Sequence, residues 1–289
     1  MKGWLVVNAF FELKKFDEIY GLLLCSAQKH GISLEMKKTD ELTLYAADGF
    51  SKTELPDFAI FWDKDIYLAK LLENAGVRLF NTADAIEICD NKAKTYIALS
   101  KNNIRTPKTV TAPKTFEGVG YTNVDFVKNA TEKLGFPVVI KEVYGSFGQQ
   151  VYLAETLNDA LDIVEKLGCK EFVIQEFIRE SKGKDIRINV VGGRVVASML
   201  RENKNDFRSN ITNGGTAFSY TPTEKECEIA VLSCRAANLD FAGVDVLFGK
   251  DGEPYICEIN SNPHFKSTLD VTGINLADYI MEYIGDKMK

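Results

Sequence analysis

The 289-residue sequence has few histidines and no closely spaced cysteines. His30 and His264 are the only histidines, and none of the six scattered cysteines forms a C-x-x-C pair, which argues against a zinc site. Single cysteines in a chain of this length are typical of small buried side chains in a reducing compartment. We therefore expect a cytoplasmic protein.

The sequence also lacks a basic excess and long apolar runs. Its formal net charge of −6 argues against a nucleic-acid partner, because neutralising phosphates needs clustered basic residues. No window approaches the roughly 20 apolar residues of a membrane span, and the apolar stretch at residues 3–11 is too short for a signal peptide. Neither a Walker A motif nor a G-x-G-x-x-G fingerprint is present. We expect neither nucleic acid nor membrane as a partner.

Strand and helix signals alternate along the first 90 residues. Residues 5–10, 58–62 and 77–80 read as strands, and residues 17–29 and 66–74 as helices. This rhythm predicts a small open parallel sheet, in which ligands collect at the carboxyl ends of the strands. Asn8 and Asp63 are therefore weak site candidates, although a loop or cap role is commoner.

The remaining sequence is richer in strands. A helix capped by Asp90 is expected to run through Leu99, and a capping box at residues 223–226 starts another. Further helices are expected at 124–134, 157–167 and 276–284, and strands at 137–141, 151–154, 172–177, 185–191, 194–201, 241–248 and 254–260.

The last two strands suggest a hairpin that carries three oxygen ligands. If Asp251-Gly252 is a two-residue turn, counting outward places Asp245 opposite Glu258, and Asn260 opposite Gly243 on the same face. Facing carboxylates repel each other unless a cation lies between them. An all-oxygen set selects Mg²⁺ (or Mn²⁺) over zinc. The alternative is the exposed polar face of an edge hairpin.

Two further segments carry features of a nucleotide site. Lys141 ends an apolar strand and is followed by a loop bearing Gly145, Ser146 and Gly148, which could cover phosphates with backbone N–H groups, although an ordinary glycine hairpin is the commoner reading. Glu176 and Phe177 leave a buried strand, so a chain crossing between two lobes could contact adenine there. Asp185 could hold ribose hydroxyls. Arg187, Arg201 and Arg208 have guanidinium groups suited to phosphates, but a single arginine is more often a solvated surface residue.

Taken together, these motifs resemble the ATP-grasp fold and, more narrowly, the RimK-like α-L-glutamate ligases. The resemblance runs from about Asp90 to the C-terminus. It rests on the succession Lys141…Gly145-Ser146…Gly148, Gln175-Glu176-Phe177-Ile178, Gly183-Lys184-Asp185-Ile186-Arg187, Phe207-Arg208-Ser209-Asn210, Gly214-Gly215, Gly243-Val244-Asp245 and Glu258-Ile259-Asn260.

The resemblance implies an α/β chain with α+β lobes and three parts. These are a Rossmann-like pre-ATP-grasp domain at residues 1–89, a central lobe with the glycine-bearing loop at 90–174, and a C-terminal lobe with the metal site at 175–289. It also implies ATP and Mg²⁺ as cofactors. The partners would be an amino acid such as glutamate and a carboxylate-bearing metabolite, peptide or protein tail, and a homo-oligomer is compatible with it.

By resemblance, each motif also has a role. Lys92 and Lys141 would contact ATP phosphates, Lys141 and Arg208 would serve catalysis, and Glu176 and Phe177 would hold adenine. The other implied contacts are Gly145 and Ser146 at the phosphates, Asp185 at the ribose, Arg208, Ser209 and Asn210 at the phosphate and acyl site, and Asp245, Glu258 and Asn260 at Mg²⁺.

The implied reaction is an ATP-dependent joining of a carboxylate and an amine through an acyl phosphate. Two alternatives stay open: a D-alanine–D-alanine-type or other ATP-grasp ligase, and a nucleotide-binding protein without catalysis. The segment after Asn260 departs from the family pattern, with His264 and Lys266 in place of small or neutral residues. This departure leaves the transferred amino acid open. Exchange of Asp245 or Glu258 for alanine is expected to abolish turnover and leave the fold intact.

Overall fold

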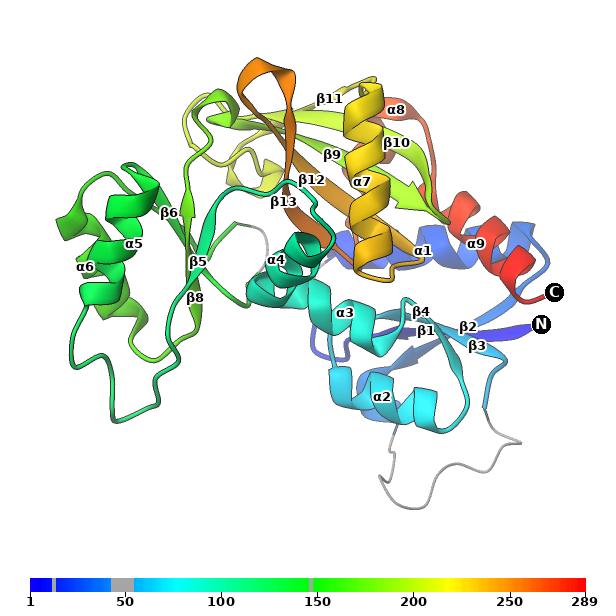
Figure 1. Cartoon of the computed structure of the whole chain (residues 1–289). Coiled ribbons are helices and arrows are strands. Elements are labelled where there is room, and N and C mark those ends of the chain that lie inside the picture. The colour runs from blue at the N-terminus through cyan, green and yellow to red at the C-terminus, as the bar shows by residue number, and fades with distance from the viewer. Residues whose placement is uncertain (12–13, 43–54, 146–147) are drawn as a thin grey trace.

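The computed structural model describes residues 1–11, 14–42, 55–145 and 148–289. Three sheets organise this part of the chain, and each belongs to a separate body in Figure 1. The central body projects to one side, while the other two lie against each other near both termini.

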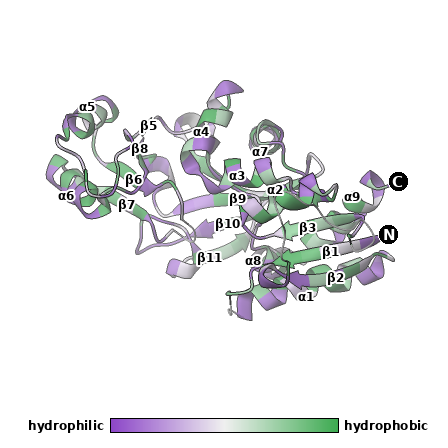
Figure 2. Cartoon of the chain, turned by 90° about the horizontal axis from the view of Figure 1, so that it is seen from below, coloured by the Kyte–Doolittle hydropathy of each residue, from purple (hydrophilic) through white to green (hydrophobic). Residues whose placement is uncertain are grey.

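The N-terminal body is a parallel sheet covered on both faces, as expected from its alternating strands and helices. Its strand order is β2-β1-β3-β4. Alternate residues of β1 enter two different cores, Leu5 and Val7 on one face and Trp4 and Val6 on the other. A strand buried on both faces reads as a continuous apolar run, which is why β3 and the second half of β1 are mainly hydrophobic in Figure 2, whereas β1 begins with the exposed Lys2. The elements are β1 (Lys2–Val7), α1 (Lys14–Lys29), β2 (Ser33–Lys38), η1 (Thr39–Glu41), β3 (Phe58–Trp62), α2 (Ile66–Asn74), β4 (Arg78–Phe80) and α3 (Ala83–Asp90).

The central body is an antiparallel sheet whose own helices, α5 and α6, cover one face, while α4 (Lys92–Lys101) packs on part of the other. The strand order is β5-β8-β6-β7. Val138 and Ile140 of β6 pack with α5 and α6, while Val139 and Lys141 point to the opposite face. The rest of that opposite face is therefore left for a ligand. The elements are β5 (Thr109–Thr111), α5 (Asp125–Leu134), β6 (Val138–Glu142), β7 (Val151–Ala154), α6 (Leu157–Leu167) and β8 (Phe172–Glu176).

The C-terminal body is a larger antiparallel sheet of order β11-β10-β9-β12-β13. Its apolar face packs on α7 and on α4, through residues such as Ile188, Val244, Ala230 and Leu99. The opposite face carries the charged residues of β9, β10 and β12. The elements are α4 (Lys92–Lys101), η2 (Arg179–Ser181), β9 (Lys184–Val191), β10 (Arg194–Glu202), η3 (Ile211–Asn213), β11 (Thr216–Ser219), α7 (Glu224–Ala236), β12 (Phe241–Phe248), η4 (Lys250–Gly252), β13 (Pro254–Asn260), α8 (Lys266–Thr272) and α9 (Leu276–Lys287).

The N-terminal and C-terminal bodies share a core. Ile280 and Ile284 of α9 belong to the same core as Leu5 and Leu23, and α9 packs on α1 and on β9. Helix α4, although it precedes the central sheet, packs on the C-terminal one. The division into residues 1–89, 90–174 and 175–289, and the Rossmann-like label for the first part, stay predictions.

Two local predictions were wrong. Asp90 is the last residue of α3, and Asn91 caps α4 by accepting a hydrogen bond of 2.9 Å from the Lys94 amide. The β12–β13 turn is also longer than the two-residue loop expected at Asp251-Gly252, because the last cross-strand pair is Phe248 with Pro254.

The register at the predicted ligands is nevertheless as expected. Val246 pairs with Ile256 and Asp245 with Glu258, so Cys257 is an extra residue that forms a β-bulge. The bulge compensates for the longer turn, and Gly243 faces Asn260. Ile256 and Ile259 both enter the core, while Cys257 and Glu258 line a cavity.

Candidate active site

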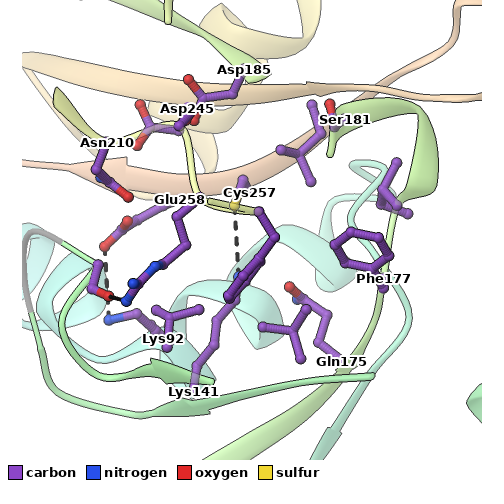
Figure 3. A pocket seen from close by; sticks show the side chains of 18 of the residues that line it. Lys92, Lys141, Gln175, Phe177, Ser181, Asp185, Asn210, Asp245, Cys257 and Glu258 are labelled. Carbon is purple, nitrogen blue, oxygen red and sulfur yellow. Dashed lines mark hydrogen bonds and ion pairs between the residues drawn. The ribbon is translucent and has the colours of Figure 1, made fainter. Parts of the chain in front are cut away.

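The first cavity lies between the charged face of the C-terminal sheet and the face of the central sheet that is opposite α5 and α6. In Figure 3, Lys141 and Gln175 approach from the central sheet, and Asp185 and Asp245 face them from the other side. The residues that line it are Lys92, Val139, Lys141, Gly145, Gly148, Gln150, Val151, Gln175, Glu176, Phe177, Ile178, Ser181, Lys184, Asp185, Phe207, Arg208, Ser209, Asn210, Asp245, Leu247, Cys257 and Glu258.

Lys141 is buried at the floor of this cavity. Its Nζ lies 3.3 Å from the Tyr96 hydroxyl and 3.6 Å from Cys257 Sγ. Burial disfavours the ammonium form, but the surrounding Cys257, Tyr96 and Glu258 outweigh it, and the pKa of Lys141 is raised. Lys141 is therefore a fixed positive charge at neutral pH.

Lys92 is a second cation at the cavity, at the start of α4. Its Nζ donates a hydrogen bond of 3.0 Å to the carbonyl of Gly145 and lies 3.8 Å from Glu258 Oε1. The predicted phosphate lysine therefore contacts the backbone of the predicted phosphate loop. Ser146 of that loop lies outside the described residues.

Arg208 contacts the same loop from the C-terminal body. Its Nη1 donates a hydrogen bond of 2.6 Å to the carbonyl of Gly148, while Asp206 holds the rest of the guanidinium group. This ion pair lowers the pKa of Asp206. Gly148 has a φ of +71°, which favours glycine, and an added Cβ would lie 2.6 Å from Asn210 Oδ1, so a larger residue would strain the backbone and displace Asn210. Ser209 is buried beside them.

The crossing between the two bodies forms the far end of the cavity. Glu176 Oε1 accepts a hydrogen bond of 2.8 Å from the Lys108 amide, which fixes the strand that enters the central body. The rings of Phe177 and Phe207 meet with centroids 6.3 Å apart. The amide of Phe248 donates a hydrogen bond to Ser181 Oγ at 2.6 Å. The predicted crossing residues thus line the cavity.

The charged face of the C-terminal sheet holds a buried network of two carboxylates and two guanidinium groups. Arg201 donates to Asp185 at 2.7 and 2.6 Å, and its Nη2 also lies 3.0 Å from Asp245 Oδ1. Arg187 donates two hydrogen bonds to Asp245, from Nε to Oδ1 and from Nη2 to Oδ2, and the second is 2.9 Å long. Burial would raise the pKa of Asp245, but the two arginines hold it below its ordinary value.

These contacts change the interpretation of the facing carboxylates. In this structure the cations that balance Asp245 are Arg187 and Arg201, and Lys92 lies near Glu258. The cross-strand pairing of Asp245 with Glu258 alone therefore does not require a metal. The space above Gly243 is also occupied, since an added Cβ would lie 3.0 Å from Arg187 Nη1 and 2.8 Å from Pro263 Cβ.

The three predicted ligands still form a donor set that fits Mg²⁺. Asp245, Glu258 and Asn260 present only oxygen acceptors from two paired strands, the set that a hard divalent cation prefers. Asn260 donates its amide Nδ2 toward the carbonyl of Gly243 at 3.4 Å. Over the described ranges, no group of three or more histidine, cysteine, aspartate or glutamate side chains could hold a metal, so Asn260 and ligand oxygens would have to complete the site.

A second, larger cavity adjoins the first. The second cavity contains about 1660 Å³ of space and the first about 840 Å³, with the space at their open mouths included. Both cavities are lined by Gly145, Asn210, Asp245 and Glu258. Asn8 and Asp63 line the second cavity, as expected for the carboxyl ends of β1 and β3. Its other residues are Phe11, Lys15, Phe16, Tyr20, Trp62, Lys64, Cys89, Asp90, Arg187, Met199, Arg201, Ile211, Thr212, Ile259, Asn260, Ser261, Asn262, His264 and Ser267.

The two residues that depart from the family pattern have different positions. His264 lines the second cavity, its Nε2 lies 3.1 Å from the Lys15 carbonyl oxygen, and burial lowers its pKa. Lys266 instead pairs with Asp270 along α8 and does not line that cavity.

Sequence reasoning missed Tyr96 and Cys257. Tyr96 of α4 donates a hydrogen bond of 2.7 Å to the Cys257 carbonyl and also meets Lys141, so it links both walls of the first cavity. Cys257 reaches the cavity because of the bulge, which no local sequence signal indicates. The ion pairs that Asp185 and Asp245 form with the arginines were also not predicted, although the opposite charges of these residues are visible in the sequence.

The two-lobed cleft, with cations beside a glycine-bearing loop and carboxylates on the facing sheet, defines an ATP-grasp architecture. A RimK domain ATP-grasp protein from Sphaerobacter thermophilus superposes with a TM-score of 0.75 at 20% identity, covering 98% of this chain and 99% of that one. A D-alanine–D-alanine ligase from Bacillus anthracis in complex with ATP gives 0.74 at 18% identity, covering 100% and 96%. At these identities the likeness supports the fold alone.

The sequence comparisons identify the family. Residues 89–284 match the model of the RimK-like ATP-grasp domain, and the chain belongs to this family. A probable alpha-L-glutamate ligase of Psychromonas ingrahamii is 37% identical over 226 residues, which are 77% of this chain and 72% of the relative. N-acetylaspartylglutamate synthase A of Homo sapiens is 33% identical over 240 residues, which are 81% of this chain but 60% of that protein.

The comparisons confirm three expectations. The resemblance to RimK-like ligases is correct, the fold is ATP-grasp, and the named relatives are ligases and synthases, as expected for an ATP-dependent enzyme that forms C–N bonds. No helix in the described part of the chain is both long and apolar enough to cross a membrane. The cytoplasmic location stays a prediction.

Proposed function

We propose that this ligase activates a small carboxylic acid with Mg-ATP and joins it to the amine of an amino acid, with glutamate as the first candidate. The observation that supports this most is the meeting of the two cavities at Asp245 and Glu258. Nucleotide in the first cavity and acid in the second would bring the γ-phosphate and the carboxylate together there. Two relatives, an α-L-glutamate ligase and N-acetylaspartylglutamate synthase A, have names that suggest glutamate.

The reaction would proceed in two displacements. A carboxylate oxygen of the acid attacks the γ-phosphorus of ATP, and ADP leaves. The amine nitrogen then attacks the acyl carbon, phosphate leaves, and the nitrogen loses a proton to solvent, which gives the amide. Positioning and charge stabilisation carry most of such a reaction.

The residues of the cleft have matching roles in this proposal. Lys92 and Arg208, which now donate to carbonyls of the loop, would turn to phosphate oxygens, and Lys141 would add a fixed positive charge. Gly145, Ser146, Ser209 and Asn210 would line the phosphates. Glu176 and Phe177 would border adenine, and Asp185, with its carboxylate braced by Arg201, stays the predicted ribose contact.

Asp245, Glu258 and Asn260 would hold Mg²⁺. When bound, the ion offsets the charge of the phosphate oxygens. Because Arg187 already grips Asp245, ion binding would require Asp245 to share its oxygens or to release Arg187. If Arg187 were released, its guanidinium group would remain in the second cavity, beside the acid.

The test is ADP release in the presence of Mg-ATP, L-glutamate and a panel of acids, with the product identified by mass. We expect ADP only when an acid and an amine are both present, and a product mass equal to their sum less one water. Tight Mg-ATP binding without ADP release for any pair would favour a nucleotide-binding protein instead. D-Alanine supplied as both substrates tests the other ligase chemistry.

A further inference from the structure

The second cavity has an aromatic wall supplied mainly by the N-terminal body. We use this name for Phe11, Phe16, Tyr20, Trp62 and His264, all of which line the cavity. Ring centroids are 5.4 Å apart between Phe11 and Phe16, 6.4 Å between Phe16 and Tyr20, and 6.3 Å between Phe16 and His264. Four of the five residues lie outside the matched family domain, so this wall is a feature of this chain's own N-terminal part.

The residues of the aromatic wall differ in how much of their side chains is exposed. Tyr20 and Trp62 are nearly covered by the core, at 7% and 6% exposure. Phe16 is half-buried, and Phe11 is 53% exposed at the rim. An apolar surface inside a cavity with a few polar groups at its far side is typical of a small-molecule site.

His264 adds a flat neutral ring to this wall. Burial lowers its pKa, and Phe16 meets it edge-on at 80°. The histidine therefore extends the apolar surface at neutral pH and does not supply a positive charge.

The charges of the second cavity are already balanced. Its described residues include four basic side chains, Lys15, Lys64, Arg187 and Arg201, and four acidic ones, Asp63, Asp90, Asp245 and Glu258. Arg187 and Arg201 contact Asp245, and Lys64 pairs with Asp90. An acid with one carboxylate can use the arginines near Asp245, but the cavity has no cationic excess for a polyanionic tail.

We propose that the acid activated in this site carries an aromatic ring, or a similarly flat apolar group, that packs on Phe11 and Phe16. Its single carboxylate points toward Asp245 and Glu258, where the two cavities meet. This inference rests on the proposed function, because it takes the second cavity as the acid site. It places the choice of acid with the N-terminal body and disfavours an acidic peptide tail.

The test compares three acids that share one backbone. N-acetylphenylalanine carries a ring, N-acetylaspartate carries a second carboxylate, and N-acetylalanine carries neither. Each is titrated by calorimetry into the protein with Mg²⁺ and a non-hydrolysable ATP analogue, and each is assayed for ADP release with L-glutamate. We expect N-acetylphenylalanine to bind about three- to tenfold more tightly than N-acetylalanine, the range of an aromatic pair contact. N-acetylaspartate should bind most weakly.

Variants of the aromatic wall then show which residues cause the preference for an acid with a ring. Phe11→Ala and Phe16→Leu should bring N-acetylphenylalanine to the affinity of N-acetylalanine, while nucleotide affinity stays unchanged. Phe10→Ala is the matched control, because Phe10 is 81% exposed and does not line either cavity. Circular dichroism and thermal unfolding would show that each variant is folded.

Binding and turnover separate the two proposals. Preferential binding of N-acetylphenylalanine without ADP release would leave the aromatic site standing and refute the ligase assignment for this acid and amine. Tighter binding of N-acetylaspartate, or a preference for the ring that survives in both Phe11→Ala and Phe16→Leu, would overturn the aromatic site while leaving the ligase intact.

Discussion

Arg187 of β9 and Asp245 of β12 are cross-strand partners, and the guanidinium group of Arg187 donates two hydrogen bonds to the Asp245 carboxylate. Asp245 therefore has a structural partner as well as a predicted metal to bind. Removing its charge should affect both folding and ligand binding.

Asp245→Asn is expected to lower the free energy of unfolding by about 3–5 kcal/mol, because two buried guanidinium groups lose their shared counter-charge. This replaces the sequence-based expectation that loss of Asp245 leaves the fold intact. Urea unfolding at neutral pH measures the change. A variant as stable as the wild type would contradict the buried network.

Glu258→Gln is the matched variant on the facing strand. Its side chain is 31% exposed and its nearest cation, Lys92, is 3.8 Å away, so the loss should be at most about 1 kcal/mol. Both variants should nevertheless lose Mg²⁺-dependent nucleotide affinity, measured by calorimetry with and without the ion. Retained ion dependence in both would refute the proposed metal ligands.

Lys92→Met should weaken ATP binding about tenfold or more, because a buried charge-assisted contact is worth about 1.5–3 kcal/mol. Lys94→Met, two residues along α4, is the control: Lys94 is exposed and pairs with Glu87. Equal nucleotide affinities in the two variants would exclude Lys92 from the phosphate site.

Arg208→Lys should lower kcat by about 10²-fold or more, the effect of losing one donor to a developing charge. A lysine keeps the charge but cannot contact Asp206 and the Gly148 side of the loop at once. Steady-state kinetics with saturating ATP provide the measurement. A change confined to the KM for ATP would assign Arg208 to nucleotide binding instead of catalysis.

His264 should make stability depend on pH. Its folded pKa lies below the unfolded value of about 6.5, so the unfolded chain takes up the proton first. Stability is full above pH 6.5 and falls as the pH drops through that value, with a slope of at most about 1.4 kcal/mol per unit. Urea unfolding at pH 7.5 and 5.5 measures this.

His264→Gln should flatten this part of the stability profile. His30→Gln removes an exposed histidine and serves as the control. If the stability of His264→Gln depended on pH as that of the wild type does, groups other than His264 would cause the pH dependence.

Much of the fold could be predicted because apolar runs and caps are local signals. The bounds of β3, α2, β7, α6, β12 and β13 agree with the sequence prediction. β2, β5 and β11 were missed, since short or polar edge strands owe their existence to a neighbouring strand. Helices α3 and α8 were missed as well.

The site was harder to predict because its contacts depend on strand register. A straight count from the Gly192-Gly193 turn would place Leu200 opposite Asp185. A bulge between Val195 and Ala197 instead places Arg201 there, where it holds the carboxylate. The hairpin of Asp245 and Glu258 was placed correctly only because a longer turn and a bulge offset each other.

The bulge residue of that hairpin also has a consequence for altering the enzyme. Cys257 has no cross-strand partner, so its side chain can change without moving Asp245, Glu258 or Asn260 out of register. Its carbonyl, which holds Tyr96, belongs to the backbone and survives any such exchange. Position 257 is therefore a natural place to enlarge or narrow the cleft and so to fit the enzyme to a modified nucleotide analogue.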